Sequence, residues 1–123
     1  MSLIRFCYDT EGDILDITFD FGKPNQREGF ELNDNIVLFV DRETDRPLGL
    51  MFISYSKLLQ KIMSLDYLDT MPPAQQHRLM KILGTDLLKP FLTLVSPRWI
   101  GAGSAKPEVR VGNPNVNELV AVA

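Results

Sequence analysis

Apolar and polar residues alternate in short runs through the first 55 positions, as expected of β-strands with one buried face. The clearest run is 14–21. Within it, Leu15, Ile17 and Phe19 lie on one face, while Asp16 and Thr18 lie on the other. We therefore expect the first three to be core residues and the last two to be outside the core.

Four further runs predict strands and differ in how completely they are buried. The run at 3–8 alternates, and the run at 27–32 carries more charge, which is typical of an edge strand. The runs at 36–40 and 48–53 are nearly continuously apolar, which indicates burial on both faces. Short segments rich in Asn, Asp, Gly and Pro separate these runs and predict turns.

The second half of the chain carries helical patterns that would cover the sheet. A first helix is capped by Ser54 or Ser56, and a second opens at Pro72 and Pro73 and stops at Gly84. A third is predicted over 87–95, where apolar residues have helical spacing. The apolar stripes of these helices comprise Leu58, Leu59 and Ile62, then Leu79, Met80 and Leu83, then Leu87, Leu88, Phe91, Leu92 and Val95.

These patterns predict an α+β fold, with a mainly antiparallel β-meander of about five strands followed by two or three helices. One domain would span 1–95, with its sheet at 3–54 and its helices at 55–95. Residues 96–123 would form a C-terminal arm, ordered or partly disordered, with faint strand signals at 108–111 and 119–122.

Trp99 and Ile100 stand out as apolar residues in this polar, glycine-rich arm. They would anchor the arm either on another subunit or back on the core of the same chain. Because two strands are apolar on both faces and one layer of helices covers only one face, we expect a homo-oligomer, most simply a dimer, with the arm in its interface.

Composition and charge narrow the possible functions. The 123 residues are 45% hydrophobic and 24% charged, and no apolar stretch approaches the length of a membrane span. The chain enters a strand pattern at once, without a signal peptide, and has a single cysteine, Cys7, so we expect a cytoplasmic protein. Residues 1–55 carry eleven acidic against five basic side chains, and residues 56–123 carry five against eight, which disfavours nucleic-acid binding by the sheet.

The acidic residues around the first turn, Asp9, Glu11 and Asp13, are the weak candidates for a metal site. Their spacing does not match a calcium-binding loop, and turn capping explains them better. No catalytic residue, cofactor site or nucleophile motif with its companion elements is present, so we expect a protein without enzymatic activity.

Several short motifs resemble a known family. Tyr8-Asp9, Asp13-x-Leu15-x-Ile17, Asn35-Ile36-Val37-Leu38 and Pro47-Leu48-Gly49-Leu50 follow in the order and spacing of the YuzE-like family, small prokaryotic domains of unknown function. The resemblance covers about residues 3–55. It implies a small antiparallel sheet followed by a helix, and an antitoxin-like binding role, because members are often encoded beside small toxin-like proteins. It brings no catalytic residues. The chain departs from the family in its apolar Met51-Phe52 and in its C-terminal extension.

We therefore expect a protein-binding module with a small protein partner, one that also self-associates. The alternatives are a purely structural homo-oligomerisation module and a small-molecule or metal-binding enzyme that uses the acidic strand face.

Overall fold

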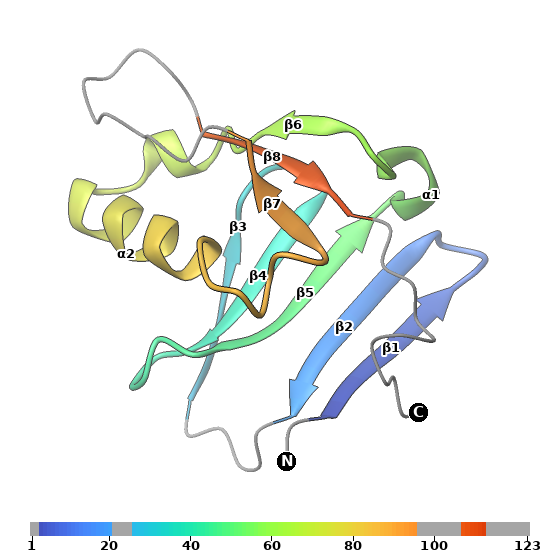
Figure 1. Ribbon diagram of the computed structural model, residues 1–123, viewed down its shortest axis with the longest axis horizontal. Coiled ribbons are helices and arrows are strands. Elements are labelled where there is room, and N and C mark those ends of the chain that lie inside the picture. The colour runs from blue at the N-terminus through green and yellow to red at the C-terminus, as the bar shows by residue number, and fades with distance from the viewer. Residues whose placement is uncertain (1–2, 21–25, 96–106, 113–123) are drawn as a thin grey trace. The chain divides into compact units, whose positions relative to one another are not determined.

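The computed structural model describes residues 3–20, 26–95 and 107–112 of the chain. These residues fall into two compact units, the first ending at Lys57 and the second beginning at Leu58. Each unit contains an antiparallel sheet (Figure 1). The predicted α+β class is confirmed.

The first unit is built on five strands in the spatial order β1-β2-β5-β4-β3. Their antiparallel pairing is confirmed, but the expected meander order is wrong because β5 lies between β2 and β4. Composition explains the order, since β4 and β5 are apolar nearly throughout and take inner positions, whereas the charged β3 is an edge. The strands are β1 Leu3–Asp9, β2 Ile14–Asp20, β3 Arg27–Glu31, β4 Ile36–Asp41 and β5 Pro47–Ile53.

One face of this sheet is buried, and β2 shows the register most clearly. Leu15, Ile17 and Phe19 are 7%, 2% and 2% exposed, which confirms them as core residues, while Asp16 and Thr18 on the other face are half-buried. Residues directly opposite each other on paired strands share a face. The other buried apolar residues of this unit are Leu32, Ile36, Leu38, Val40, Leu48, Leu50 and Phe52.

The turn before β4 is held by a buried amide side chain. Asn33 Oδ1 accepts hydrogen bonds from the backbone N–H of Asn35 at 2.8 Å and of Ile36 at 2.9 Å. Asn35 Nδ2 in turn donates to the carbonyl of Ile53 at 2.9 Å, which ties this turn to the end of β5. The Asn-Asp-Asn segment therefore turns the chain as its composition predicts.

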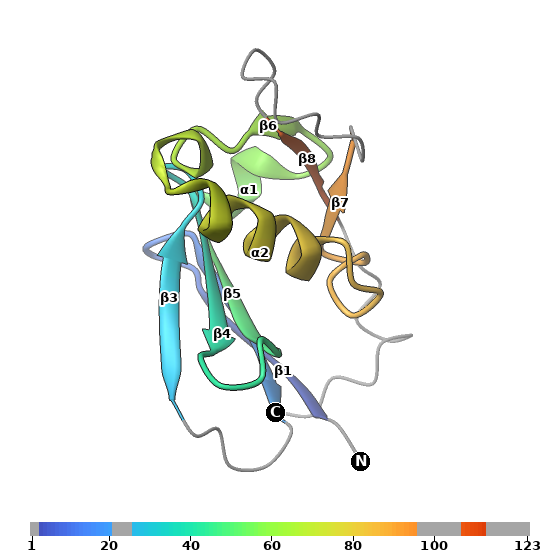
Figure 2. The same cartoon turned by 90° about the vertical axis from the view of Figure 1, so that its left-hand side faces the viewer.

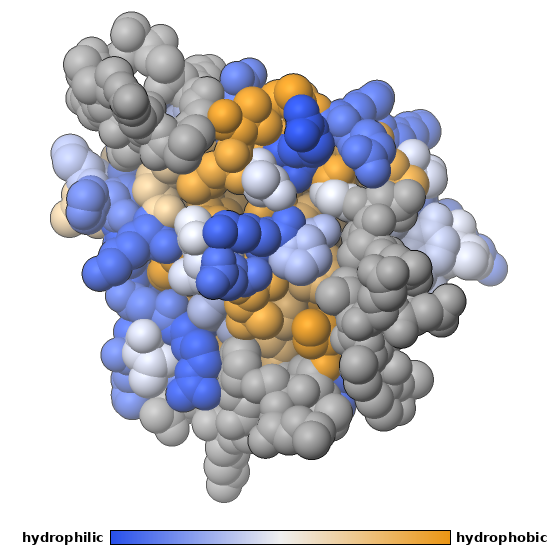
Figure 3. Space-filling view, viewed as in Figure 1, coloured by the Kyte–Doolittle hydropathy of each residue, from blue (hydrophilic) through white to orange (hydrophobic). Residues whose placement is uncertain are grey.

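The second unit contains a small sheet of three strands, in the order β6-β8-β7, and one helix of several turns. Its elements are β6 Ile62–Ser64, the 3₁₀ turn η1 Leu68–Thr70, α2 Pro73–Leu83, β7 Leu92–Leu94 and β8 Glu108–Val111. Helix α2 confirms the second predicted helix, with Pro72 before it and Gly84 after it. Hydrophobic residues reach the surface in Figure 3 where β6 and β8 lie in Figure 1. Ile62 of β6 is 49% exposed.

The first predicted helix is shorter than expected. Helix α1 covers only Tyr55–Leu58, and Ile62, expected on its apolar stripe, belongs to β6. The reason lies at Gln60, whose φ of 64° is incompatible with a right-handed helix. The Gln60 N–H donates to the carbonyl of Val111 at 3.0 Å, so the chain joins the second sheet instead.

The third predicted helix, over 87–95, is wrong. Residues up to Phe91 form successive turns closed by i to i−3 hydrogen bonds, such as Phe91 N–H to the Leu88 carbonyl at 2.9 Å, and β7 follows. Strand β8 explains the difference, because its pairing with β7 overrides the local helical pattern. This strand comes from the segment expected to be an arm, and Val109 and Val111 are fully buried. The strand signal at 108–111 is thus confirmed, whereas that at 119–122 lies outside the described residues.

None of the described helices is long and apolar enough to cross a membrane.

Candidate functional site

The orientation of the main chain can be followed across the first sheet from one hydrogen bond. The N–H of Ile53 donates to the Asn35 carbonyl at 2.8 Å, so the main-chain polar groups of Ile53 point toward β4. Successive residues of a strand point these groups to alternate sides. Leu50 and Phe52 therefore point theirs toward β2, where Ile17 and Leu15 lie opposite.

The same alternation carries over to β1, because the registers of β2 with β5 and with β1 run without a bulge. Asp16 and Thr18 point their main-chain groups toward Cys7 and Arg5 of β1. On β1, the residues on either side of Arg5 and Cys7 point their main-chain groups away from β2. The N–H and carbonyl groups of Ile4, Phe6 and Tyr8 thus face the outer side of β1, where none of the described residues forms a neighbouring strand (Figure 1).

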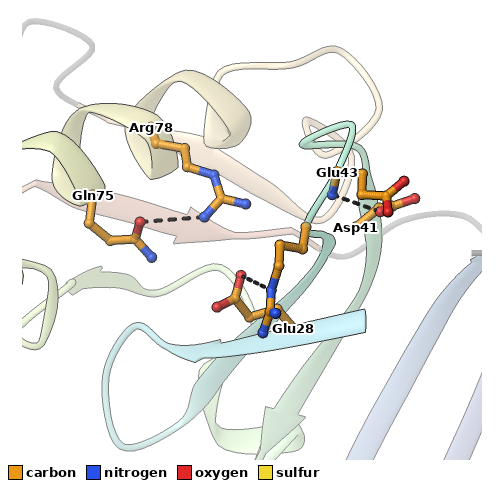
Figure 4. Close-up of polar contacts among 6 residues, drawn as sticks. Glu28, Asp41, Glu43, Gln75 and Arg78 are labelled. Atoms are coloured by element: carbon orange, nitrogen blue, oxygen red, sulfur yellow. Dashed lines mark hydrogen bonds and ion pairs between the residues drawn. The ribbon is translucent and has the colours of Figure 1, made fainter. Parts of the chain in front are cut away.

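The two edges of this sheet differ in how they are protected. Strand β3 is the opposite edge (Figure 2), and its outward-pointing residues include the charged Arg27 and Glu31. The Arg27 guanidinium lies 4.1 Å from the centre of the Phe39 ring, and Glu28 forms a 3.9 Å contact with Arg42 (Figure 4). Charged side chains of this kind discourage pairing with another strand.

Strand β1 lacks such protection at the corresponding positions. Its outward-pointing residues are the apolar or aromatic Ile4, Phe6 and Tyr8, the strand is seven residues long, and it contains no proline and no bulge. Long, unbulged, apolar edges are the ones that pair with other chains. The outer side of β1, which we call the open edge, is therefore the candidate binding surface with the strongest physical basis among the described residues.

A polar cluster fixes the end of β1 next to the turn. Asp13 Oδ1 accepts a hydrogen bond from the Tyr8 hydroxyl at 2.6 Å and from the Ser56 N–H at 3.0 Å. Asp13 Oδ2 accepts from the Ser56 hydroxyl at 2.6 Å, and the Asp13 carbonyl accepts from the Tyr55 N–H at 2.9 Å. One carboxylate thus joins the first hairpin to the start of α1 across 43 positions of sequence.

These hydrogen bonds have electrostatic consequences. Donation by the Ser56 hydroxyl, together with donation by Tyr8 and by the Ser56 N–H, lowers the pKa of Asp13 from its ordinary value. The same bond to Asp13 raises the pKa of Tyr8, since the neutral phenol is the donor. A carboxylate with a lowered pKa is a weak base, so this cluster is poorly suited to general base catalysis. Its role is structural, and we call the hydrogen-bonded group of Tyr8, Asp13 and Ser56 the clasp.

Aromatic rings continue from the clasp into the core. The Tyr8 and Tyr55 rings meet edge to face with centroids 6.3 Å apart, and Tyr55 packs on the buried Phe52 at 5.6 Å. Tyr8 nevertheless remains 46% exposed. A held but exposed tyrosine is a common anchor in protein interfaces, because little conformational entropy is lost on binding.

Two of the three carboxylates considered as metal ligands accept hydrogen bonds from other parts of the chain. Asp9 Oδ1 accepts from the Glu11 N–H at 3.1 Å, and Asp13 forms the clasp. Within the described part of the chain, no three His, Cys, Asp or Glu side chains are grouped to hold a metal ion. The other two candidate residues, Trp99 and Ile100, lie outside the described residues.

Two further polar contacts each lie within one unit. Asp41 Oδ1 accepts from the Glu43 N–H at 3.0 Å in the first unit, and in the second unit Arg78 Nη1 donates to Gln75 Oε1 at 3.4 Å within α2 (Figure 4). Neither arrangement brings together groups for catalysis.

Neither the open edge nor the hydrogen bonds of Asp13 follow from the local sequence pattern. The alternation at 3–8 already placed Ile4, Phe6 and Tyr8 on one face, but it carries no information on which strand is an edge. The contact between Asp13 and Ser56 joins distant positions of the chain, and no local pattern predicts it.

No family model, curated protein or solved structure matches this chain.

Proposed function

We propose that the protein is a protein-binding module that adds an extended segment of another chain to the open edge of β1. In this mode, main-chain hydrogen bonds supply affinity, and side chains on alternate positions supply specificity. The observation that carries the proposal is the outward orientation of the main-chain groups of Ile4, Phe6 and Tyr8, three uncharged residues of an edge strand.

The aromatic end of β1 supports the same function. Tyr8 is held by Asp13 and by the Tyr55 ring, so its exposed ring is a preorganised contact beside the last outward-pointing backbone groups. Preorganised side chains lose less conformational entropy when a partner binds. The resemblance to the YuzE-like family adds a partner class, a small toxin-like protein in the cytoplasm of a prokaryote.

The test compares capture of a partner from native cells by the wild-type protein and by edge variants. Phe6→Pro removes an outward-pointing N–H without removing a ladder hydrogen bond, and Phe6→Ala controls for loss of the ring. Glu31→Pro removes an outward N–H on the opposite edge. Circular dichroism and thermal unfolding establish that each variant is folded.

We expect Phe6→Pro to lose the partner, while Phe6→Ala retains part of it and Glu31→Pro retains it fully. Equal capture by Phe6→Pro and wild type would contradict the proposal. Recovery of nothing but the chain itself would contradict binding of a different protein.

A further inference from the structure

We infer that the open edge of β1 also pairs with β1 of a second copy of this chain, antiparallel about a two-fold axis at Cys7. This inference rests on the proposed function, because it names one occupant of the same edge. Charged residues lie on one face of β1 and aromatic residues on the other, and both sets favour this pairing.

The main-chain orientation limits the possible registers. In an antiparallel pair, a residue whose polar groups point to the partner lies opposite one that does the same. Since Ile4, Phe6 and Tyr8 point outward, even-numbered residues pair with even-numbered residues of the second copy. A two-fold axis must therefore pass beside a residue, and the central candidates are Arg5, Phe6 and Cys7.

Charge selects among these registers. Pairing about Arg5 places the two Arg5 side chains opposite each other, and like charges directly opposite are destabilising. Pairing about Phe6 places Arg5 opposite the neutral Cys7. Pairing about Cys7 places Arg5 opposite Asp9 of the second copy, and two-fold symmetry makes this complementary contact twice. Arg5, Cys7 and Asp9 are all exposed on the same face of the strand.

The other face favours the same register. Pairing about Cys7 places Phe6 opposite Tyr8 of the second copy, again twice. Phe6 and Tyr8 are also residues with outward-pointing backbone groups, so each of these pairs exchanges both hydrogen bonds. Aromatic pairs directly opposite each other are among the favourable cross-strand contacts.

The expected dimer is weak. Pairing along part of one strand buries much less than the roughly 1,600 Å² of a standard stable interface. We therefore expect the dimer to dissociate on dilution, which leaves the edge of β1 available to another partner.

A charge exchange tests the register. Arg5→Asp and Asp9→Arg each place like charges opposite each other at both symmetric contacts, and each should raise the dimer dissociation constant about tenfold. The double variant Arg5→Asp/Asp9→Arg restores opposite charges and should return the constant to within about threefold of the wild-type value. Sedimentation velocity over a dilution series measures all four proteins.

Disulfide trapping gives an independent measure. The two Cys7 residues would form a non-hydrogen-bonded pair with Cα atoms about 4.5 Å apart, within the range for a disulfide. Cys7 is exposed. Oxidation of the wild type with diamide should therefore yield a disulfide-linked dimer. The matched control Cys7→Ser/Arg5→Cys moves the only thiol to a position opposite Asp9, and it should cross-link much more slowly.

Restoration by the double variant together with selective trapping at Cys7 supports the inference. It is overturned if the wild type remains monomeric at every concentration, if the double variant is as weak as either single variant, or if the control cross-links as fast as the wild type. A monomeric wild type that still captures another protein through Phe6 would overturn this inference and leave the proposed function intact.

Discussion

Replacing Ile17 by alanine tests the register of the first sheet directly. Ile17 is 2% exposed and lies between Phe6 of β1 and Leu50 of β5, the residues directly opposite it on the two neighbouring strands. The change removes three buried carbon atoms, each contributing about 0.8 kcal/mol of transfer free energy, and leaves a cavity. We expect the free energy of unfolding to fall by about 2–5 kcal/mol.

Thr18→Ala is the matched control, because Thr18 neighbours Ile17 in the same strand but lies half-buried on the other face. We expect its cost to stay below about 1 kcal/mol. Urea unfolding followed by circular dichroism measures both variants, and equal slopes of free energy against urea concentration justify the comparison. Equal costs for the two variants, or a cost for Ile17→Ala below about 1 kcal/mol, would refute the register.

Three further predictions concern other features of the first unit. Gly49→Ala should destabilise by about 1–3 kcal/mol in urea unfolding, because a Cβ at Gly49 would lie 2.5 Å from the Ile17 carbonyl oxygen. Gly12→Ala should cost less, because the tightest contact of its Cβ, at 2.9 Å, is with Oδ2 of the exposed Asp9 side chain and not with the backbone. Equal costs would contradict this packing. The folded-state pKa of Asp13 is lowered, so its stabilising effect is present above the ordinary aspartate pKa of about 4 and is lost as pH falls through the lowered value. The difference in stability between wild type and Asp13→Asn should therefore shrink in acid, and a difference independent of pH would contradict the clasp. Calcium, magnesium or zinc in excess should leave the melting temperature unchanged, and a saturable rise abolished by Asp13→Ala would reinstate a metal site.

The strands of the first sheet could be predicted because each has a local signature. The alternation at 14–21 reflects one buried face, and the apolar runs at 36–40 and 48–53 correspond to the inner strands β4 and β5. The order of the strands could not be predicted in the same way, because it depends on which strands, distant in sequence, form hydrogen bonds with each other. The open edge of β1 follows from this order, so it was also beyond local reasoning.

The second half was harder to predict because tertiary pairing decides its structure. Residues 87–95 have helical spacing, but β7 forms there because β8, from the far end of the chain, pairs with it. Truncation after Val95 would remove β8, the central strand of the second sheet, so it would disrupt this unit as well as any interface that the arm forms. The arm interface expected around Trp99 stays a prediction.

The most direct test of the open edge is amide hydrogen exchange of β1, resolved by residue in NMR spectra over a range of protein concentrations. The account predicts that the Phe6 and Tyr8 amides exchange rapidly in dilute protein, while the Arg5 and Cys7 amides, bonded to β2, exchange slowly. As the concentration rises, Phe6 and Tyr8 should become protected and Cys7 should not change. Exchange at Phe6 and Tyr8 that stays the same at every concentration, whether fast or slow, would contradict pairing of this edge with a second copy of the chain.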